Sequence, residues 1–209
     1  SSIQIENVTK RFGDFSAVSN LSLDIAEGEF VALLGPSGCG KTTTMNMIAG
    51  LEDATEGAIL FNGQNLSHTR IQDRNIGFVF QNYAIFTHLS VRKNLAYGLA
   101  VRRVPSPEIE RRVKAMADRM RLAHGLDQQA SSLSVNEMQK LAIGRSAIVE
   151  PRIFLLDEPL SNLDAAFRAY MRAELKVLQR EFGQTMMYVT HDQVEAMSLA
   201  DKIAIIDRG

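Results

Sequence analysis

The chain has 209 residues, 45% of them hydrophobic and 22% charged, with a formal net charge of −1 and a single cysteine, values typical of a globular domain. The near-neutral balance provides no basic excess to hold nucleic acid, and one cysteine excludes an internal disulfide and suits a reducing compartment. No apolar run approaches 18 residues and no charged-then-apolar leader opens the sequence, so we expect neither a membrane span nor a secretory signal.

Short segments in the first third of the chain have the pattern of β-strands. Residues 3–8 and 21–25 alternate apolar with polar side chains, which indicates strands that are buried on one face. Residues 58–61 form another short strand, which ends at the turn Asn62-Gly63. Strands joined by such short turns suggest an antiparallel sheet beside the glycine-rich loop at residues 35–42.

That loop reads Gly-Pro-Ser-Gly-Cys-Gly-Lys-Thr, which is the pattern G-x-x-x-x-G-K-[ST]. It follows an apolar run at residues 29–34 and precedes a helix-like run at residues 43–49, the context in which this pattern binds phosphate. The glycines let backbone N–H groups turn toward phosphate oxygens, Lys41 reaches the outer phosphates, and the Thr42 hydroxyl can bind Mg²⁺. We interpret Cys39 as a small filler residue rather than a reactive thiol. The loop therefore predicts binding of a nucleoside triphosphate.

The middle of the chain, from about residue 90 to residue 150, is predicted to be helical. Ser106-Pro107 begins one helix, with proline in its first turn. One face of this helix is apolar at helical spacing: Ile109, Val113, Met116, Ala117 and Met120. We interpret its arginines as a solvated face, because acids are interspersed with them, and its methionines as packing residues.

After Pro151 the pattern returns to buried strands separated by helices. Strands are predicted at residues 153–157, 186–190 and 202–207, and helices at 164–182, where Asp164 is the N-cap, and at 192–199. This alternation predicts a parallel sheet with helices on its faces.

The predicted strand at residues 153–157 ends in two acids, Asp157 and Glu158. The alternative without function is a pair of acids that cap a strand at the surface. In phosphate-loop proteins, however, an acid in this place holds Mg²⁺ through its water shell. The second carboxylate can then polarise the attacking water as a general base. We therefore assign Asp157 to the metal and Glu158 to catalysis.

Gln81 and His191 also follow predicted strands, at residues 76–80 and 186–190. Because the carboxyl ends of parallel strands meet at one edge of a sheet, we expect both side chains to share a cleft with Lys41. Gln81 could ligate Mg²⁺ or position water, and His191 could donate to the γ-phosphate or to Glu158. The remaining histidines are interpreted as structural: His68, His88 and His124.

Taken in order, these motifs resemble the ATPase domain of ABC-type transporters. The matching segments are Phe12 before Gly13 (the aromatic that stacks on adenine), residues 35–42 (Walker A), Gln81 (Q-loop), 153–158 (Walker B and the catalytic glutamate), 161–164 (D-loop) and 190–192 (the switch histidine). The resemblance covers residues 1–209 and implies an α/β P-loop fold with a mixed parallel core sheet, an antiparallel β subdomain and an inserted helical subdomain at about residues 84–150.

The resemblance also implies the cofactors, ATP and Mg²⁺, and their contacts. Glu158, His191 and Gln81 would be catalytic, and Thr42, Gln81 and Asp157 would hold the metal. The implied nucleotide contacts are Phe12, Gly35, Pro36, Ser37, Gly38, Cys39, Gly40, Lys41, Thr42, Thr43, Asp157, Ser134 and Asp164.

Three further segments, at residues 83–91, 159–165 and 188–197, resemble the ATPase subunits of carbohydrate importers of the maltose and glycerol-phosphate type. This resemblance implies an ATP-hydrolysing subunit that powers transport of a sugar or polyol from the cytoplasmic face of the membrane. Its partners would be membrane-spanning permease subunits, a second ABC ATPase subunit and, indirectly, an extracytoplasmic solute-binding protein. That branch usually carries a C-terminal regulatory domain, which this chain lacks, so we expect a truncated C-terminus.

One motif departs from the family pattern. The family signature is Leu-Ser-Gly-Gly-Gln, whereas residues 133–137 read Leu-Ser-Val-Asn-Glu. In the family, two subunits enclose two ATPs, and the signature faces the partner's γ-phosphate as a helix N-terminus. Val135 adds bulk there and Glu137 adds negative charge, so we expect weakened activity, although Ser134 is kept.

The sequence leaves three alternatives to a fully active transport ATPase. The chain could be an ATP-binding subunit with weak hydrolysis that pairs with a different, competent ABC ATPase, or it could form a homodimer with two slow sites. A soluble ABC ATPase that acts on DNA repair or ribosomes is disfavoured by the length and charge of the chain.

Overall fold

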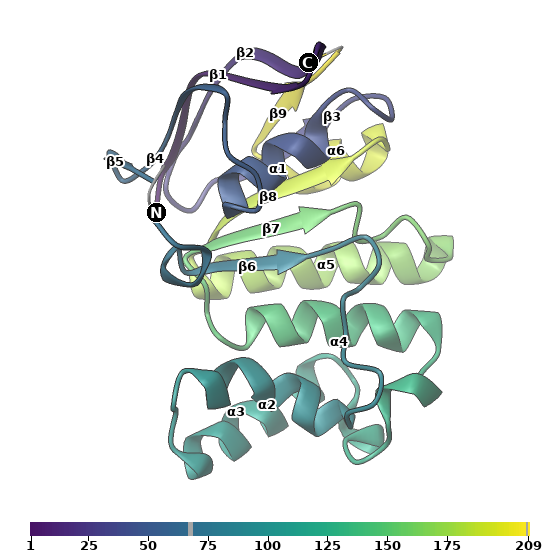
Figure 1. The fold of residues 1–209 in the computed structure, drawn as a ribbon. Coiled ribbons are helices and arrows are strands. Elements are labelled where there is room, and N and C mark those ends of the chain that lie inside the picture. The colour runs from purple at the N-terminus through teal and green to yellow at the C-terminus, as the bar shows by residue number, and fades with distance from the viewer. Residues whose placement is uncertain (67–68, 208) are drawn as a thin grey trace. The chain divides into compact units, whose positions relative to one another are not determined.

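A computed structural model describes residues 1–66, 69–207 and 209, so His68 lies outside the described residues. The chain divides into two compact units (Figure 1). The first comprises Ser1–Phe78, Arg152–Glu158 and Arg172–Gly209, and the second comprises Val79–Pro151 and Pro159–Met171. Along the described parts of the chain, no helix combines the length and the apolar character needed to cross a membrane.

An antiparallel sheet lies in the first unit, as the early strands indicated. Its strand order is β2-β1-β4-β5, formed by β1 (Ile3–Phe12), β2 (Phe15–Ile25), β4 (Glu56–Phe61) and β5 (Gln64–Asn65). The first two strands are longer than the sequence predicted, because β1 continues to Phe12 and β2 begins at Phe15. Their pairing shifts register at several points, and these irregularities interrupt the alternation by which strands are recognised.

The second sheet has the order β6-β7-β8-β3-β9, formed by β6 (Ile76–Val79), β7 (Ile153–Asp157), β8 (Thr185–Thr190), β3 (Phe30–Leu34) and β9 (Lys202–Ile205). β3 runs parallel to both β8 and β9, and β7 runs parallel to β8, which confirms the predicted parallel sheet. Every residue of β7 and β8 is buried, as expected for central strands of such a sheet. The carboxyl ends of β3, β7 and β8 therefore lie at one edge.

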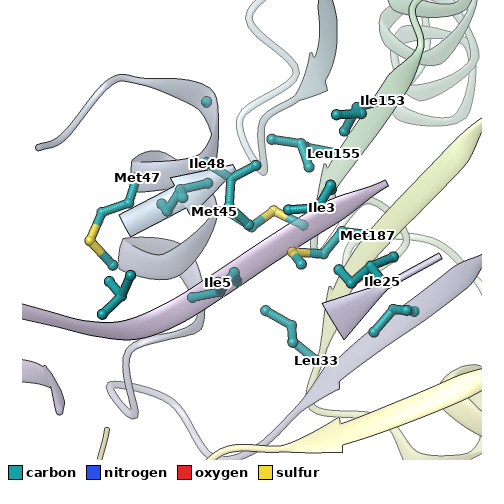
Figure 2. Close-up of a cluster of buried hydrophobic side chains, with 14 of the residues drawn as sticks. Ile3, Ile5, Ile25, Leu33, Met45, Met47, Ile48, Ile153, Leu155 and Met187 are labelled. Atoms are coloured by element: carbon teal, nitrogen blue, oxygen red, sulfur yellow. The ribbon is translucent and has the colours of Figure 1, made fainter. Parts of the chain in front are cut away.

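Helix α1 (Lys41–Ala49) is anchored by its buried side. Figure 2 shows Met45 of this helix pointing toward Ile3 of β1 and Met187 of β8, in a cluster of buried side chains. At the other end of the helix, the guanidinium of Arg74 donates to the carbonyl oxygens of Met47 at 3.2 Å and Ile48 at 2.9 Å. These contacts satisfy carbonyls that a helix C-terminus leaves without intrahelical partners, and they fix the C-terminal end of α1.

The second unit contains α2 (Val91–Val101), α3 (Ser106–Arg119) and α4 (Val135–Ala147). Their packing is close at Gly144, where a Cβ would lie 3.2 Å from Cγ of Met120 and 3.3 Å from Cδ2 of Leu95. Met116 and Met120 are buried, so the predicted packing role of these methionines agrees with the structure.

The charged side of α3 is exposed or half-buried, in keeping with the interspersed acids. Glu108 accepts hydrogen bonds from Arg111 at 2.7 Å and from Arg112 at 2.6 Å, and these bonds lower the pKa of the Glu108 carboxyl to about 2. Arg111 and Arg112 are thus engaged by an acid of the same helix.

Two further helices complete the fold, α5 (Ala165–Phe182) and α6 (Gln193–Leu199). The backbone N–H of Phe167 donates to Oδ1 of Asp164 at 2.9 Å, which confirms Asp164 as the cap of α5. Met171, Leu175 and Leu178 are buried along one face of this helix.

Candidate active site

The glycine-rich loop connects the end of β3 with the start of α1 in the first unit. Gly40 precedes the helix with φ of 100°, a left-handed conformation that glycine adopts without strain. A Cβ at Gly40 would also collide with the carbonyl oxygen of Ala17. The sequence needs glycine here for two reasons, and the result is a loop that delivers the next residue, Lys41, to the helix N-terminus.

The side chain of Lys41 is buried and folds back over the loop. Its Nζ donates to the carbonyl oxygens of Gly35 at 2.8 Å and Pro36 at 2.7 Å, and it lies 3.6 Å from Sγ of Cys39. A buried ammonium is stable only with such partners. The carbonyls hold the positive charge inside the loop, where a phosphate oxygen could replace them. Cys39 is buried as a loop residue, in agreement with its interpretation as a filler.

Thr42 and Asp157 meet across the edge of the parallel sheet. The Thr42 hydroxyl lies 3.2 Å and 3.1 Å from the two carboxylate oxygens of Asp157, although 115 residues separate them in sequence. Burial raises the pKa of the Asp157 carboxyl, and the negative charge of Glu158 adds to this effect, while the Thr42 hydrogen bond and Lys41 oppose it. A buried carboxylate whose ionised form is disfavoured is suited to receive a cation.

Glu158 follows Asp157 in an unusual backbone conformation. Its φ is 44°, in the left-handed region that costs a residue with a side chain about 1–2 kcal/mol. The turn is fixed by the backbone N–H of Glu158, which donates to the carbonyl of Val189 at 3.1 Å. Strain of this kind is concentrated at functional sites. Here the left-handed turn directs the carboxylate toward His191, whose Nδ1 lies 3.4 Å from Oε1 of Glu158.

The structure thus brings five of the predicted site residues into one unit: Lys41, Thr42, Asp157, Glu158 and His191. Phe12 belongs to the same unit, at the exposed end of β1, where Nζ of Lys10 lies 4.8 Å from the centroid of its ring. Gln81, Ser134 and Asp164 belong to the second unit. Their predicted roles toward the nucleotide stay predictions.

The altered signature forms a closed set of contacts within the second unit. The carboxylate of Glu137 accepts from the backbone N–H of Ser134 at 2.9 Å and from its hydroxyl at 2.7 Å, while Ser134 Oγ accepts from the backbone N–H of Glu137 at 3.3 Å. The bond from the backbone N–H of Ser134 has the largest effect in lowering the pKa of the Glu137 carboxyl, and the bond from its hydroxyl adds to it. His124, whose Nε2 lies 3.3 Å from Oε1 of Glu137, lowers this pKa as well. The Ser134 hydroxyl therefore donates its hydrogen bond to a carboxylate of its own helix.

Asn136 adds a second contact that the glycine of the usual signature could not make. Its Nδ2 donates to Oδ2 of Asp164 at 3.3 Å, which ties the signature to the cap of α5. The capping pair itself was visible in the sequence, since Ser-x-x-Glu before a helix is the pattern of a capping box. The contact with Asp164 had no comparable local signal.

Comparisons with known proteins agree with the order of the motifs. A family model described as "ABC transporter" matches residues 18–161. The chain is 49% identical over 209 residues to the maltose/maltodextrin import ATP-binding protein MalK of Escherichia coli K12, and 48% identical to MalK of Photorhabdus laumondii. Each match covers the whole of this chain, but only 56% of the Escherichia coli protein and 57% of the Photorhabdus laumondii protein.

Solved structures give the same assignment. The dimeric ATP-binding cassette MJ0796, in a post-hydrolysis state bound to ADP and Pi, superposes with a TM-score of 0.89 at 30% sequence identity. This match covers 99% of the chain and 95% of the cassette. Because the family model covers most of the chain and the solved cassette matches nearly all of it, the chain belongs to the ABC transporter family.

Proposed function

We propose that this chain is the ATP-hydrolysing subunit of an importer for a sugar or a polyol. The observation that carries the proposal is the meeting of Thr42 with Asp157 at the glycine-rich loop, in the same unit as the Glu158–His191 pair. A phosphate-binding loop, a metal-binding acid, a second acid and a histidine together are the groups that hydrolysis of a bound triphosphate requires.

The residues present suit magnesium and a triphosphate. Mg²⁺ prefers oxygen ligands and keeps several waters, and the Thr42 hydroxyl with the Asp157 carboxylate offers two kinds of oxygen side by side. Lys41 would exchange its bonds to the carbonyls of Gly35 and Pro36 for bonds to phosphate oxygens. Bound Mg²⁺ neutralises charge on the phosphates, and the raised pKa of Asp157 would fall in its presence.

Glu158 and His191 would carry out the proton chemistry. Glu158 accepts a proton from the attacking water while a bond forms between that oxygen and the γ-phosphorus, and the bond from the γ-phosphorus to the bridging oxygen of ADP breaks. His191 holds the Glu158 carboxylate, and its exposed ring can also donate to a γ-phosphate oxygen. Gln81 would position water or complete the coordination of the metal, as the resemblance implies.

Two relatives support the transport assignment. The MalK proteins are named for maltose and maltodextrin import, and the chain is 48–49% identical to them along its whole length. By this likeness the chain would work at the cytoplasmic face of the cell membrane with permease subunits and a second ABC ATPase subunit. An extracytoplasmic solute-binding protein would act on it indirectly. ATP binding would close the pair of ATPase subunits and hydrolysis would reopen it.

The test is purification of the chain from membranes, followed by identification of the co-purifying chains and measurement of ATP hydrolysis with and without Mg²⁺. We expect permease subunits, magnesium-dependent turnover, and a loss of turnover of about 10²- to 10⁴-fold in Glu158→Gln. Turnover unchanged by Glu158→Gln would overturn the catalytic assignment. Recovery of the chain without any membrane subunit would overturn the transport assignment and leave the ATPase assignment standing.

A further inference from the structure

A buried carboxylate lies beneath the turn that carries His191, and the proposed chemistry does not use it. Glu195, in the first turn of α6, is 3% exposed. Its Oε2 accepts from the hydroxyl of Tyr188 at 2.8 Å and from that of Thr190 at 2.8 Å. Carboxylates are seldom buried so deeply unless they are paired, because burial costs free energy that hydrogen bonds must offset, and the two hydroxyls are such partners.

Thr190 connects this carboxylate with the backbone on both sides of His191. Its hydroxyl donates to Glu195 and also accepts from the backbone N–H of Asp192 at 2.9 Å. Asp192 in turn accepts from the backbone N–H groups of Val194 at 2.7 Å and Glu195 at 3.2 Å. Thr190 and Asp192, on either side of His191, are therefore joined by the Thr190 hydroxyl. Asp192 is in turn held at the start of α6, the helix that contains Glu195.

The orientation of the His191 ring depends on the backbone of residues 190–192. Its side chain is 58% exposed, so packing around the ring is sparse, and its Nδ1 lies 3.4 Å from Oε1 of Glu158. From the other side, the Glu158 backbone is tied to Val189 of the same strand, β8. The backbones of Glu158 and His191 are therefore both fixed at the end of β8. The hydrogen bonds of Thr190 with Glu195 and Asp192 then hold the turn that follows this strand.

We propose that Glu195 is a positioning residue for the reaction, acting through the Thr190 hydroxyl to aim His191 at Glu158. This inference rests on the proposed ATPase function. Small displacements of a catalytic group lower the rate strongly, by as much as about 100-fold for 1 Å, without weakening substrate binding at a separate loop. Loss of the relay should therefore lower kcat and leave KM for ATP unchanged.

The chain offers a matched pair of variants. Thr190→Val and Tyr188→Phe each remove one hydroxyl from the same oxygen of Glu195, and the threonine hydroxyl in addition accepts from the backbone N–H of Asp192, next to His191. In the assembled transporter we expect Thr190→Val to lower kcat about tenfold with KM within twofold. We expect Tyr188→Phe to lower kcat less than threefold, and Thr190→Ser, which keeps the hydroxyl, to restore turnover to near that of the parent.

Equal effects of Thr190→Val and Tyr188→Phe, or a rise in KM at unchanged kcat, would show that the network only supports the fold. If Thr190→Val does not fold, Glu195→Gln decides the question, because it keeps the shape but weakens charge-assisted hydrogen bonds to neutral ones. We then expect kcat to fall about threefold at constant KM, and an unchanged kcat refutes the role. Should Glu158→Gln also leave turnover intact, the failure lies in the proposed function rather than in this inference.

Discussion

The N-terminus of α4 carries a capping box in which Ser134 is the N-cap and Glu137 the third residue of the helix, and the most informative single change is Glu137→Gln. We predict that it raises the ATPase rate of the assembled transporter. The resemblance implies that Ser134 serves the γ-phosphate of a partner subunit, and for this its hydroxyl must leave the carboxylate that it now contacts at 2.7 Å. Glutamine is the residue of the usual signature and still completes a capping box, so the helix start is retained.

The magnitude follows from the one hydrogen bond that must break, which the Ser134 hydroxyl donates to Glu137; the backbone N–H of Ser134 keeps its bond in the capping box. A hydrogen bond to a charged group contributes about 1.5–3 kcal/mol and one to a neutral group about 0.5–1.5 kcal/mol. Removing the charge therefore makes release of the serine easier by about 1–1.4 kcal/mol, which corresponds to a rate about five to ten times higher. Removal of a negative charge near a triphosphate acts in the same direction.

The assay is steady-state release of phosphate by the purified assembly at saturating ATP. The control is the same substitution in a Ser134→Ala background, because a gain that acts through the serine hydroxyl must disappear there. A second control, Glu108→Gln on α3, removes an acid that contacts arginines and not Ser134, and we expect a rate within twofold of the parent. An unchanged or lower rate in Glu137→Gln, or a gain that persists without the Ser134 hydroxyl, would refute the reasoning.

Three other predictions concern stability and ionisation. Asp157→Asn should raise the midpoint of thermal unfolding of the nucleotide-free chain at neutral pH while weakening Mg²⁺-dependent ATP binding. Folding raises the pKa of the Asp157 carboxyl, so the protonated acid stabilises the folded chain at low pH. That stabilisation is lost as the pH rises through the pKa of the folded state, and at neutral pH the ionised acid destabilises the fold. A lower midpoint in Asp157→Asn would contradict this reasoning. Arg74→Ala should lower the free energy of unfolding in urea by about 1.5–3 kcal/mol, because carbonyls at the end of α1 lose a charged donor, whereas Arg70→Ala, which removes an exposed ion pair, should change it by less than about 0.5 kcal/mol. Glu108 should titrate near pH 2 by NMR, and its stabilising contribution, present above the ordinary carboxyl pKa of 4.5, should be lost as the pH falls from 4.5 toward 2; a normal titration would show that its arginine contacts do not persist in solution.

The residues of the proposed phosphate site were predictable because each lies at the end of a recognisable strand or in a recognisable loop. Asp157, Glu158 and His191 come directly after apolar runs, and residues at the carboxyl ends of parallel strands share an edge of the sheet. Nδ1 of His191 lies 3.4 Å from Oε1 of Glu158, so these two strand ends do meet, while the roles of the two residues stay predictions. The left-handed backbone at Glu158 was not predictable, because it depends on a hydrogen bond to the neighbouring strand.

The hairpin of β1 and β2 shows why strand bounds were predicted less well. Residues Phe15 to Asn20 lack a regular alternation, yet they pair with β1 through a ladder whose register shifts three times. Strand formation there depends on the partner strand rather than on local preference.

The polar network under His191 was missed for a related reason. Glu195 is acidic and lies near the start of a helix, where acids are ordinarily exposed. Only the fold shows that Tyr188 and Thr190 direct two hydroxyls at it. Burial of a charged group depends on partners from another element, and a local pattern does not report them.

The central claim is that Thr42, Asp157, Glu158 and His191 act on one magnesium-bound triphosphate. The most direct test is a crystal structure of the Glu158→Gln chain with ATP and Mg²⁺. We predict Lys41 on the outer phosphates, Thr42 and Asp157 around the metal, and residue 158 with His191 facing the γ-phosphate. ATP bound away from the glycine-rich loop, or a γ-phosphate beyond the reach of residue 158 and His191, would contradict the account.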